Sequence, residues 1–368
     1  MRVLVTGANG FVGKNLVVHL REFSDIKLYL FLHSDSPEQL YHKVAQADFI
    51  FHLAGINRPK DEREFAVGNF DLTQQLCEAI KMCNRSIPVA YTSSIQAKQD
   101  NPYGISKLKA EETLFELTKV TGSPSYIYRL PNLFGKWCRP NYNSVVATFC
   151  YNIANDLPIN INDPNAMLKL VYIDDVIQDF LSVMREQPAG GYREIKPEYP
   201  ISLGSLAAEL NRFKESRNTL VTEKVGNGLT RALYSTYLSY LSPGQFSYPL
   251  IKHEDARGMF VEMLKTSDTG QFSYFTAHPG VTRGGHYHHT KNEKFLVAKG
   301  AARFRFRHVE TGETYEYCVD ASKPEIVETI PGWSHDITNI GDDEMIVLLW
   351  ANEIFDRNHP DTFTKKLS

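Results

Sequence analysis

The sequence lacks the features that would tie it to a membrane, to nucleic acid or to an oxidising compartment. No apolar run approaches the roughly 20 residues of a membrane-spanning helix, and the first residues enter a strand-like segment without a secretory signal pattern. The net charge of −3 is too small to attract nucleic acid or anionic lipid at long range. The five cysteines are scattered, with no Cys-x-x-Cys pair, which fits reduced thiols better than a disulfide framework. We therefore expect a cytoplasmic protein with no membrane insertion and no nucleic-acid partner.

With 368 residues, of which 42% are hydrophobic and 23% charged, the chain has the length and composition of two or three globular domains. Its first third alternates short apolar runs with amphipathic, helix-like stretches. The strand-like runs are Arg2–Thr6, Leu28–Leu32, Phe49–Leu53, Val89–Thr92 and Tyr126–Arg129, and the helix-like stretches include Lys14–Glu22, Asn69–Met82 and Tyr103–Thr118. This alternation predicts an α/β domain built on a doubly wound parallel sheet of the Rossmann type.

The character of the sequence changes near residue 243. Helix-like stretches at Tyr172–Met184, Gly204–Phe213 and Leu229–Leu241 precede this point, with a polar connector at Asn218–Gly228. Short β-rich runs follow it, at Phe260–Leu264, Phe272–Phe275, Lys294–Val297, Ala302–His308, Thr314–Val319, Ile326–Ile330 and Met345–Ala351. Many short strands at this spacing predict an all-β barrel or sandwich. We therefore predict a first domain over residues 1–243, with a cofactor part over about 1–130 and a second lobe over about 131–217, and a second domain over residues 244–368.

A glycine-rich turn follows the first predicted strand and opens a helix. Gly7 permits the tight turn, Gly10 lets the backbone approach a pyrophosphate, and Gly13 allows close packing of helix on strand. The phosphates would lie at the helix N-terminus, where free N–H groups and the helix dipole favour negative charge. The pattern predicts a dinucleotide site, with Phe11 and Val12 among its contacts.

The choice between the two nicotinamide cofactors depends on the end of the second strand. An acidic residue there would bind the ribose 2′-hydroxyl of NADH and disfavour the 2′-phosphate of NADPH. The sequence has Leu32-His33-Ser34 at this place, with Asp35 slightly later. We therefore expect NADPH, with His33 beside it. No arginine is present to bind the 2′-phosphate, so the sequence alone leaves NADH open.

Tyr103 and Lys107 are four residues apart in a predicted helix, so their side chains lie on one face. Lys107 can lower the pKa of the phenol and hold the nicotinamide ribose, and Tyr103 can then pass a proton to a carbonyl oxygen as hydride reaches its carbon. Ser94, a hydroxyl at the end of the preceding strand, can polarise the same oxygen. The three residues predict a carbonyl reductase.

These residues resemble the extended short-chain dehydrogenase/reductase family, in its nucleotide-sugar branch. The resemblance covers roughly residues 1–240 and includes the segments Asp48-Phe-Ile-Phe-His52-Leu-Ala-Gly55, Asn69, Arg129-Leu-Pro-Asn132-Leu-Phe-Gly135 and Tyr172-Ile-Asp-Asp175. It implies that Asp48 lies near the adenine and that Pro131 and Asn132 begin a lobe that binds a sugar nucleotide. It also implies that the cofactor is lined by Leu53, Ala54 and Gly55.

The second half of the chain carries a candidate metal site. His286 and His288 are two apart on a predicted strand, so their side chains share a face. Glu293 follows across a short turn, and His335 comes from a distant strand. Three imidazoles and a carboxylate suit a divalent zinc, iron, manganese, nickel or cobalt ion, and the spacing alone does not choose between them.

The run Gly280-x5-His286-x-His288-x4-Glu293-x6-Gly300 resembles the first motif of the cupin family. The second motif is matched only approximately by Pro331-Gly332-Trp-Ser-His335-x3-Asn339, where the proline and glycine are adjacent. The run Asp255-Ala-Arg257-Gly258-Met-Phe260-Val-Glu262 also resembles the start of the deoxysugar-nucleotide 3,5-epimerase cupins, which generally lack a metal. The fold that these resemblances imply is an all-β cupin barrel.

From end to end, the chain resembles the cupin-fused reductases that form UDP-2-acetamido-2,6-dideoxy-L-talose on the route to UDP-N-acetyl-L-fucosamine. The likeness rests on Asn101-Pro-Tyr-Gly, Pro131-Asn-Leu-Phe-Gly-Lys-Trp137, Pro140-Asn-Tyr-Asn-Ser-Val145, Tyr234-Ser-Thr-Tyr-Leu-Ser-Tyr240 and His289-Thr-Lys-Asn-Glu-Lys-Phe295. It implies capsule or O-antigen synthesis, NADPH, a zinc-bearing cupin, a UDP-linked 4-keto-6-deoxy-HexNAc substrate and a homodimer. C3 epimerisation would take place in the cupin, and C4 reduction would follow at Tyr103.

Two other functions stay open at this point. The chain could be an NADP-binding sensor or scaffold with a structural cupin, or a dehydrogenase fused to an iron-dependent cupin oxygenase. The base that would remove the C3 proton is also open, among Lys294, Glu262, His289 and a metal-bound water. Whether the metal serves chemistry or holds the barrel together is left open too.

Overall fold

The computed structural model describes residues 1–59, 61–251, 253–255, 258–260, 264–266, 270–353 and 358–367. The chain forms two compact units. The first contains Met1–Ser144 and Leu168–Pro200, and the second contains Val145–Met167 and Ile201–Ser368. Helices from the middle of the chain thus group by contact with the C-terminal β-strands. The predicted domain boundary after residue 243 stays a prediction.

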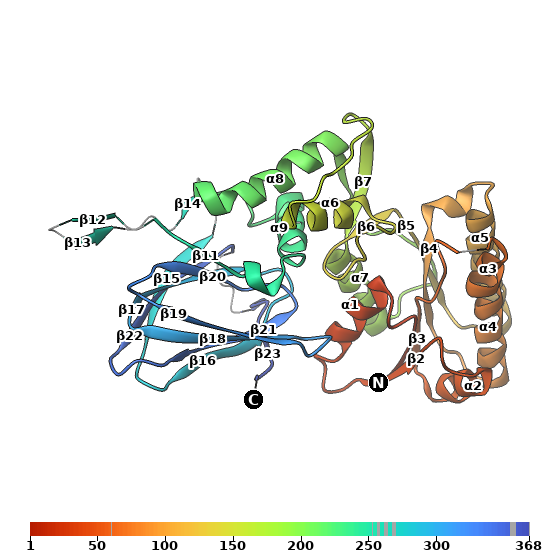
Figure 1. Cartoon of the computed structure of the whole chain (residues 1–368). Helices are drawn as coiled ribbons and strands as arrows, with labels where there is room; N and C mark the ends of the chain where they lie inside the picture. Colours follow the sequence, from red (N-terminus) through yellow and green to blue (C-terminus); the bar gives the residue numbers. More distant parts are fainter. Residues whose placement is uncertain are drawn as a thin grey trace. The chain divides into compact units, whose positions relative to one another are not determined.

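The first unit is a six-stranded parallel sheet in the order β2-β1-β3-β4-β5-β8 (Figure 1). The strands are β1 (Arg2–Thr6), β2 (Lys27–Phe31), β3 (Phe49–His52), β4 (Val89–Ser94), β5 (Ser125–Leu130) and β8 (Gly191–Arg193). The order reverses at β1, since β2 lies on one side of it and β3 on the other. The predicted doubly wound α/β sheet is confirmed, and ligands of such sheets bind at this reversal.

Helices cover both faces of this sheet (Figure 1). One layer holds α2 (Pro37–Gln46), α4 (Leu72–Met82) and α5 (Pro102–Thr121), and the other holds α1 (Phe11–Leu20) and α7 (Ile173–Glu186). The remaining elements of the unit are α3 (Arg63–Phe65), the π-helix η1 (Ala66–Asp71), the 3₁₀ helix η2 (Ile95–Lys98), and the strands β6 (Asn132–Phe134), β7 (Met167–Tyr172) and β9 (Tyr199–Ser202).

The strands of the first unit are apolar along their whole length because the sheet is covered on both faces. Leu4, Ile50, Val89 and Ile127 come from four neighbouring strands, and each is fully buried under the α2, α4 and α5 layer. Burial of each such side chain stabilises the fold by about 1.5–3 kcal/mol. Strands covered on both faces need no polar alternation, which is why the sequence shows continuous apolar runs.

Helix α5 has clear signals at both ends, and these fix the position of its first turn. The Asn101 side chain accepts a hydrogen bond from the Gly104 N–H at 2.8 Å, and Pro102 occupies the first helical position. At the other end Gly122 adopts the left-handed conformation, with φ +71°. Tyr103 therefore sits in a capped, well-defined first turn.

The second unit combines helices with an all-β part (Figure 1). Its helices are α6 (Val145–Ala154), α8 (Leu203–Thr219), α9 (Gly228–Leu238) and the short 3₁₀ helix η3 (Pro243–Gln245). Helix α8 continues six residues past the predicted end at Phe213, because Phe213 and Ser216 are buried and Arg217 is paired with Glu328. Helix α9 stops at Leu238, earlier than predicted.

The β part contains two five-stranded antiparallel sheets, ordered β11-β20-β17-β22-β15 and β19-β18-β21-β16-β23. Their strands are β11 (Ser247–Pro249), β15 (Gln271–Ala277), β16 (Thr282–Tyr287), β17 (Glu293–Lys299), β18 (Ala301–His308), β19 (Thr314–Asp320), β20 (Glu325–Glu328), β21 (Trp333–Asn339), β22 (Met345–Ala351) and β23 (Phe363–Thr364). The predicted cupin-like, all-β architecture is confirmed.

Four short strands complete the second unit: β10 (Val221–Thr222), β12 (His253–Asp255), β13 (Gly258–Phe260) and β14 (Lys265–Thr266). Strand β10 lies inside the stretch predicted as a connector. The predicted strand Phe260–Leu264 falls mostly on residues 261–263, which lie outside the described part of the chain.

Candidate active sites

The glycine-rich turn lies between the end of β1 and the start of α1, at the reversal of the strand order. Gly7 has φ +69°, and a Cβ on it would lie 2.6 Å from the Ala54 backbone nitrogen. A Cβ on Gly13 would lie 2.2 Å from the Gly7 carbonyl oxygen. Gly10 is the N-cap of α1 and supplies no side-chain cap. The first N–H groups of α1, beginning with Phe11 and Val12, therefore suit a pyrophosphate, as the sequence predicts.

The predicted lining residues follow β3 and face the same turn. The Ala54 N–H donates to the Thr6 hydroxyl at 3.2 Å, and the Leu53 N–H donates to the Thr6 carbonyl at 3.3 Å. Gly55 is next to helix α5, because a Cβ there would meet the Lys107 Nζ at 3.0 Å. The turn, the lining and Lys107 thus converge at one place.

Two cofactor residues predicted from the sequence have different outcomes. His33 is exposed and follows β2, so it lies at the carboxyl edge of the sheet, where the glycine turn also lies. Asp48 precedes β3, at the opposite edge, and its carboxylate pairs with Arg2 at 2.7 Å and with Arg85 at 3.3 Å. Arg2 holds the pKa of the Asp48 carboxyl at about 2. The expected contact of Asp48 with adenine is therefore wrong, and the residue joins the start of β1 to the start of β3.

Tyr103, Lys107 and Ser94 come together where α5 passes the end of β4. The Ser94 side chain lies near the Tyr103 hydroxyl, and the Lys107 Nζ donates to the Thr92 carbonyl at 3.0 Å. Burial raises the pKa of Tyr103, while the nearby Ser94 side chain opposes this rise. Burial lowers the pKa of Lys107 to about 8. The trio has the donor, the positioning cation and the polarising hydroxyl that carbonyl reduction needs.

Beneath this trio lies a polar network that the sequence analysis did not assign. Glu111 is one turn beyond Lys107 on α5 and is fully buried. Its carboxylate accepts hydrogen bonds from Ser93, from Arg129 at 2.5 Å and from Tyr192 at 2.9 Å. The spacing Tyr-x3-Lys-x3-Glu, which places the three side chains on one face of a helix, was the sequence signal for Glu111. The network fixes the β4 end that carries Ser94 against the helix that carries Lys107.

Asn69, which belongs to the family-like segments, also contributes to this place. It lies in the π-helix η1, is 1% exposed, and donates to the Ser106 hydroxyl at 3.0 Å. Its Oδ1 accepts the Ile56 N–H at 2.9 Å. π-Helical turns are rare and occur often at functional sites. Here the turn brings the segment after Gly55 against the catalytic helix.

The four predicted metal ligands converge in the second unit. His286 on β16 and His335 on β21 are register partners of two paired strands, and Glu293 begins β17. One ligand atom from each of His286, His288, Glu293 and His335 lies within 4.8 Å of the others. His288 lies one residue past the end of β16, so the expectation that both histidines share one strand is wrong. Their rings are nonetheless neighbours, with centroids 5.1 Å apart.

The chemical state of these side chains fits a divalent cation. Burial, with the charges of His335 and His288, lowers the pKa of His286 to about 3. Burial opposes ionisation of Glu293, yet His288 and His335 hold its pKa well below the ordinary value. Neutral imidazoles around an anionic carboxylate are the form in which such residues bind metals. The Nε2 of the buried His335 lies 3.5 Å from a Glu293 carboxylate oxygen.

Asp361 organises this cluster from a distant part of the sequence. Its backbone carbonyl accepts a hydrogen bond from the His288 Nδ1 at 2.6 Å, which directs Nε2 toward Glu293 at 3.1 Å. Its carboxylate accepts the N–H groups of His289, Thr290 and Lys291, at 3.0, 2.8 and 2.6 Å. Outer contacts of this kind fix the tautomer and orientation of a ligating histidine. The loop from His288 to Glu293 is therefore held in one conformation.

The adjacent Pro331-Gly332, which departs from the second cupin motif, makes a usable turn. Gly332 has φ +82°, and its N–H donates to the His288 carbonyl at 3.2 Å. The adjacent proline and glycine therefore leave His335 in place, and the turn before β21 is hydrogen-bonded to the loop from His288 to Glu293.

The structure places two of the candidates for the epimerisation base, Lys294 and His289. Lys294 is buried in an ion pair with Glu328, which also pairs with Arg217. Burial opposes its charge, but Glu328 raises the pKa of Lys294 well above the ordinary value, so Lys294 holds its proton. The His289 ring packs on Tyr287 and Phe363, with centroids at 5.4 and 4.8 Å. Glu262 lies outside the described residues.

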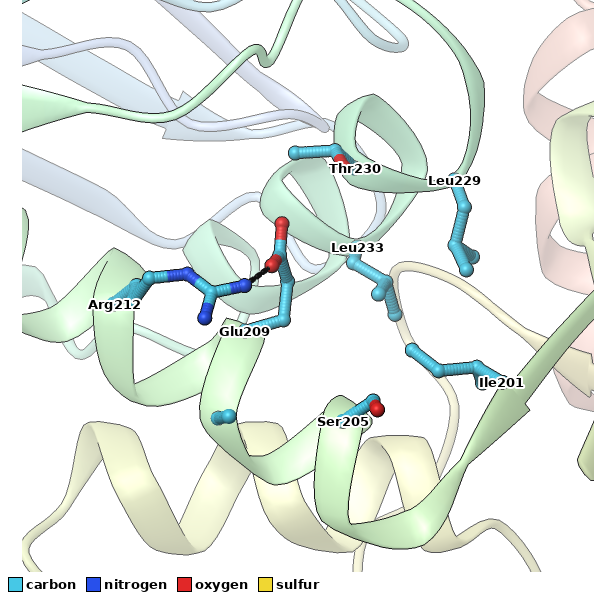
Figure 2. Close-up of a pocket in the computed structure, with 8 residues that line it drawn as sticks. Ile201, Ser205, Glu209, Arg212, Leu229, Thr230 and Leu233 are labelled. Atoms are coloured by element: carbon cyan, nitrogen blue, oxygen red, sulfur yellow. Dashed lines mark hydrogen bonds and ion pairs between the residues drawn. The ribbon is translucent and has the colours of Figure 1, made fainter. Parts of the chain in front are cut away.

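A pocket between α8 and α9 contains none of the predicted site residues (Figure 2). Ile201, Leu229 and Leu233 make one side of it apolar, and Glu209 and Arg212 form an ion pair on the other. Arg212 also pairs with Glu223 at 3.1 Å. With two carboxylates beside it, this guanidinium is already neutralised.

Comparisons with known proteins cover both halves of the chain. Residues 3–195 match the NAD dependent epimerase/dehydratase family, and residues 253–363 match the polysaccharide biosynthesis C-terminal domain. A Pseudomonas aeruginosa UDP-2-acetamido-2,6-beta-L-arabino-hexul-4-ose reductase is 58% identical over 99% of this chain and 98% of its own length. An Escherichia coli dTDP-4-dehydro-6-deoxyglucose reductase is 26% identical over 49% of this chain and 71% of its own.

Solved structures agree with this assignment. The capsular polysaccharide assembling protein CapF from Staphylococcus aureus has 44% identity and a TM-score of 0.69, with each chain covered completely. UDP-glucuronic acid 4-epimerase from Bacillus cereus, at 21% identity and a TM-score of 0.52 over 58% of this chain and 84% of its own, supports the fold alone. Among the described residues, no helix combines the length and apolar character that crossing a bilayer requires. The chain belongs to the NAD dependent epimerase/dehydratase family, as an NAD(P)-dependent reductase with a C-terminal cupin-like polysaccharide biosynthesis domain.

Proposed function

We propose that this protein is a bifunctional nucleotide-sugar enzyme of capsule or O-antigen synthesis. It inverts C3 of a UDP-2-acetamido-2,6-dideoxy-4-hexulose at the cupin-like site and then reduces C4 with NADPH at Tyr103, which gives UDP-2-acetamido-2,6-dideoxy-L-talose. The observation that carries the proposal is the presence, on one chain, of the Ser94, Tyr103 and Lys107 trio and of the His286, His288, Glu293 and His335 cluster. The printed activity of the 58% identical relative supports the substrate.

The chemistry links the two sites through one functional group. A 4-keto group acidifies the hydrogen on the neighbouring C3, so a base can remove it and a proton can return to the opposite face. A divalent cation, which we propose to be zinc, would be held by the three histidines and Glu293 and would supply positive charge beside a developing enolate oxygen. The same 4-keto group is then the acceptor for hydride and for the Tyr103 proton.

The reductase residues divide the second step among themselves. The Ser94 and Tyr103 side chains lie near each other and can hold one carbonyl oxygen between them. Lys107, fixed by the Thr92 carbonyl, favours the ionised phenol electrostatically and lies beside the cofactor lining at Gly55. NADPH is supported by Asp35, because its carboxylate pairs with Lys43 at 2.5 Å and accepts the Leu32 N–H at 2.9 Å. The Asp35 carboxylate is therefore not directed at a ribose hydroxyl of the cofactor.

Isotope exchange tests the division of labour. In D₂O without NADPH, the full chain is expected to incorporate deuterium at C3 of the 4-keto sugar, because proton abstraction needs no hydride. Addition of NADPH should then oxidise the cofactor and trap the deuterated product. NADPH oxidation without C3 exchange would remove the epimerase assignment, and exchange without oxidation would remove the reductase assignment. A need for O₂, or cofactor binding without turnover, would instead favour the oxygenase or the sensor.

Asp361 gives a separate test of the metal site. Asp361→Ala should weaken retention of the divalent ion by about 10–100-fold, the usual effect of losing an outer contact to a ligand. The physical reason is that the loop from His288 to Glu293 loses the carboxylate that accepts its N–H groups. Zinc affinity can be measured by competition with a chelator. Asp320→Ala, at the exposed end of β19, is the matched control, and equal affinities in the two variants would show that Asp361 has no such role.

We also propose a cytoplasmic homodimer. Strand β15 is the edge of its five-stranded sheet as described, and Phe272 and Tyr274 are 55% and 69% exposed on it. Exposed aromatic side chains at alternate positions of an edge strand favour pairing with a second copy. A monomeric mass by sedimentation equilibrium would exclude this arrangement.

A further inference from the structure

Two arginines of the first unit converge on one tyrosine. The guanidinium carbon of Arg58 lies 5.8 Å from the centroid of the Tyr142 ring, and that of Arg139 lies 5.1 Å from the same centroid. Both arginines are exposed, and Tyr142 is partly buried. Such contacts orient a guanidinium on the ring and leave its N–H groups available to a ligand.

This cluster lies next to the reductase site. Arg58 is three residues beyond Gly55, whose position is against the Lys107 Nζ. The same segment leads through Phe65, whose ring is 5.5 Å from the Tyr103 ring. Arg139 and Tyr142 lie on the loop that follows β6, and the contact of Tyr142 with Arg58 brings this loop to the segment that borders Tyr103 and Lys107.

The loop that carries Arg139 and Tyr142 is shaped before any ligand binds. Cys138 and Ser144, at its two ends, are hydrogen-bonded to each other. Trp137 and Asn141 adopt positive φ angles of 68° and 53°, which close the loop tightly. A pre-organised loop loses little conformational entropy when it receives a ligand.

The charge of the cluster is not compensated by protein groups. Neither Arg58 nor Arg139 has a carboxylate partner in the described ranges of the chain, whereas six other arginines of this unit are in ion pairs: Arg2, Arg63, Arg85, Arg129, Arg185 and Arg193. Two like charges on one ring repel each other unless an anion lies between or beside them. The arginine in the pocket of Figure 2 differs, because Glu209 and Glu223 already pair with it.

We propose that Arg58 and Arg139, oriented by Tyr142, form the site for the diphosphate of the nucleotide-sugar substrate. This inference rests on the proposed function for the identity of the ligand. A diphosphate carries the negative charge that would compensate the two positive guanidiniums. Planar guanidinium groups also bind phosphate oxygens in a bidentate manner. The pyrophosphate of the cofactor has its own site at the start of α1, so the reductase needs a second anion site for its substrate.

The test uses the full chain, loaded with NADPH, and UDP as the probe. Arg58→Ala and Arg139→Ala should each weaken UDP binding, measured by calorimetry, by about tenfold or more, since each removes charged hydrogen bonds. The KM for the keto sugar should rise with a much smaller change in kcat, and NADPH affinity should not change. Arg21→Ala, another exposed arginine of the unit, is the control.

The outcomes separate this inference from the reductase assignment. If the variants bind UDP as the wild type does while NADPH oxidation proceeds, the inference is wrong and the reductase assignment stands. If NADPH binding weakens in parallel with UDP binding, the arginines belong to the cofactor site and the inference is again wrong. If UDP binding is lost in the variants but the wild type never oxidises NADPH with the keto sugar, the diphosphate site stands and the proposed function fails.

Discussion

Tyr103→Phe is expected to lower kcat for NADPH oxidation with the 4-keto sugar by about 10²–10⁴-fold, the usual contribution of a positioned proton donor. The phenyl ring keeps the packing on Phe65 but removes the hydroxyl near Ser94 and leaves the carbonyl oxygen without a proton. NADPH binding should be retained, because the glycine turn and Lys107 are untouched. The measurement is cofactor absorbance during turnover.

A matched substitution distinguishes loss of the proton donor from a general effect. Tyr29→Phe removes a hydroxyl of the same unit that bonds Gln46, at the β2 side of the sheet, and should oxidise NADPH at the normal rate. Deuterium exchange at C3 should also persist in Tyr103→Phe, since the cupin-like site does not use this residue. Wild-type NADPH oxidation by Tyr103→Phe would exclude the reductase site described above.

His288→Ala is expected to remove the metal and to reduce C3 exchange to background. The substitution deletes one of the four proposed ligands and also the Nδ1 contact to Asp361, so the loop before Glu293 loses a fixed point at the same time. Metal content can be measured by mass spectrometry of the purified protein. NADPH binding, measured by fluorescence, should remain at the wild-type level.

His278→Ala provides the control, because His278 is an exposed histidine in the same unit and outside the cluster. It should keep both the metal and the exchange reaction. A His288→Ala protein with full metal content and a normal exchange rate would remove the cluster from the proposed mechanism. Loss of metal with normal exchange would instead assign the ion to the stability of the barrel.

Local sequence patterns predicted the parts of the sites that depend on short spacings. Gly7, Gly10 and Gly13 are confined to one turn, and Tyr103 and Lys107 to one turn of a helix, so their geometry follows from the elements themselves. The convergence of the four proposed metal ligands was also predicted, because the first three of them lie within eight residues, and their binding of a metal stays a prediction. In these cases the backbone geometry leaves few alternatives.

The parts that sequence reasoning missed depend on contacts between distant segments. Asp361 meets His288 from 73 residues away, and no local pattern marks it. Asp48 was misplaced because its partner Arg2 begins another strand, and only the sheet shows that both lie at the edge opposite the glycine turn. Helix α8 was predicted too short because its last turn is stabilised by Glu328, a residue of the β part.

The link from α8 and α9 to the β-strands limits how the molecule can be dissected. Arg217 and Lys294 share the buried carboxylate of Glu328, and Ser235 on α9 bonds the Thr290 carbonyl at 3.1 Å. A truncation after residue 243 would leave Arg217 as a lone guanidinium and would uncover the Tyr234 and Tyr237 rings. Exposing these rings to water removes the apolar burial that stabilises the fragment, so the complete chain, with single substitutions, is the appropriate material for assigning each reaction to its site.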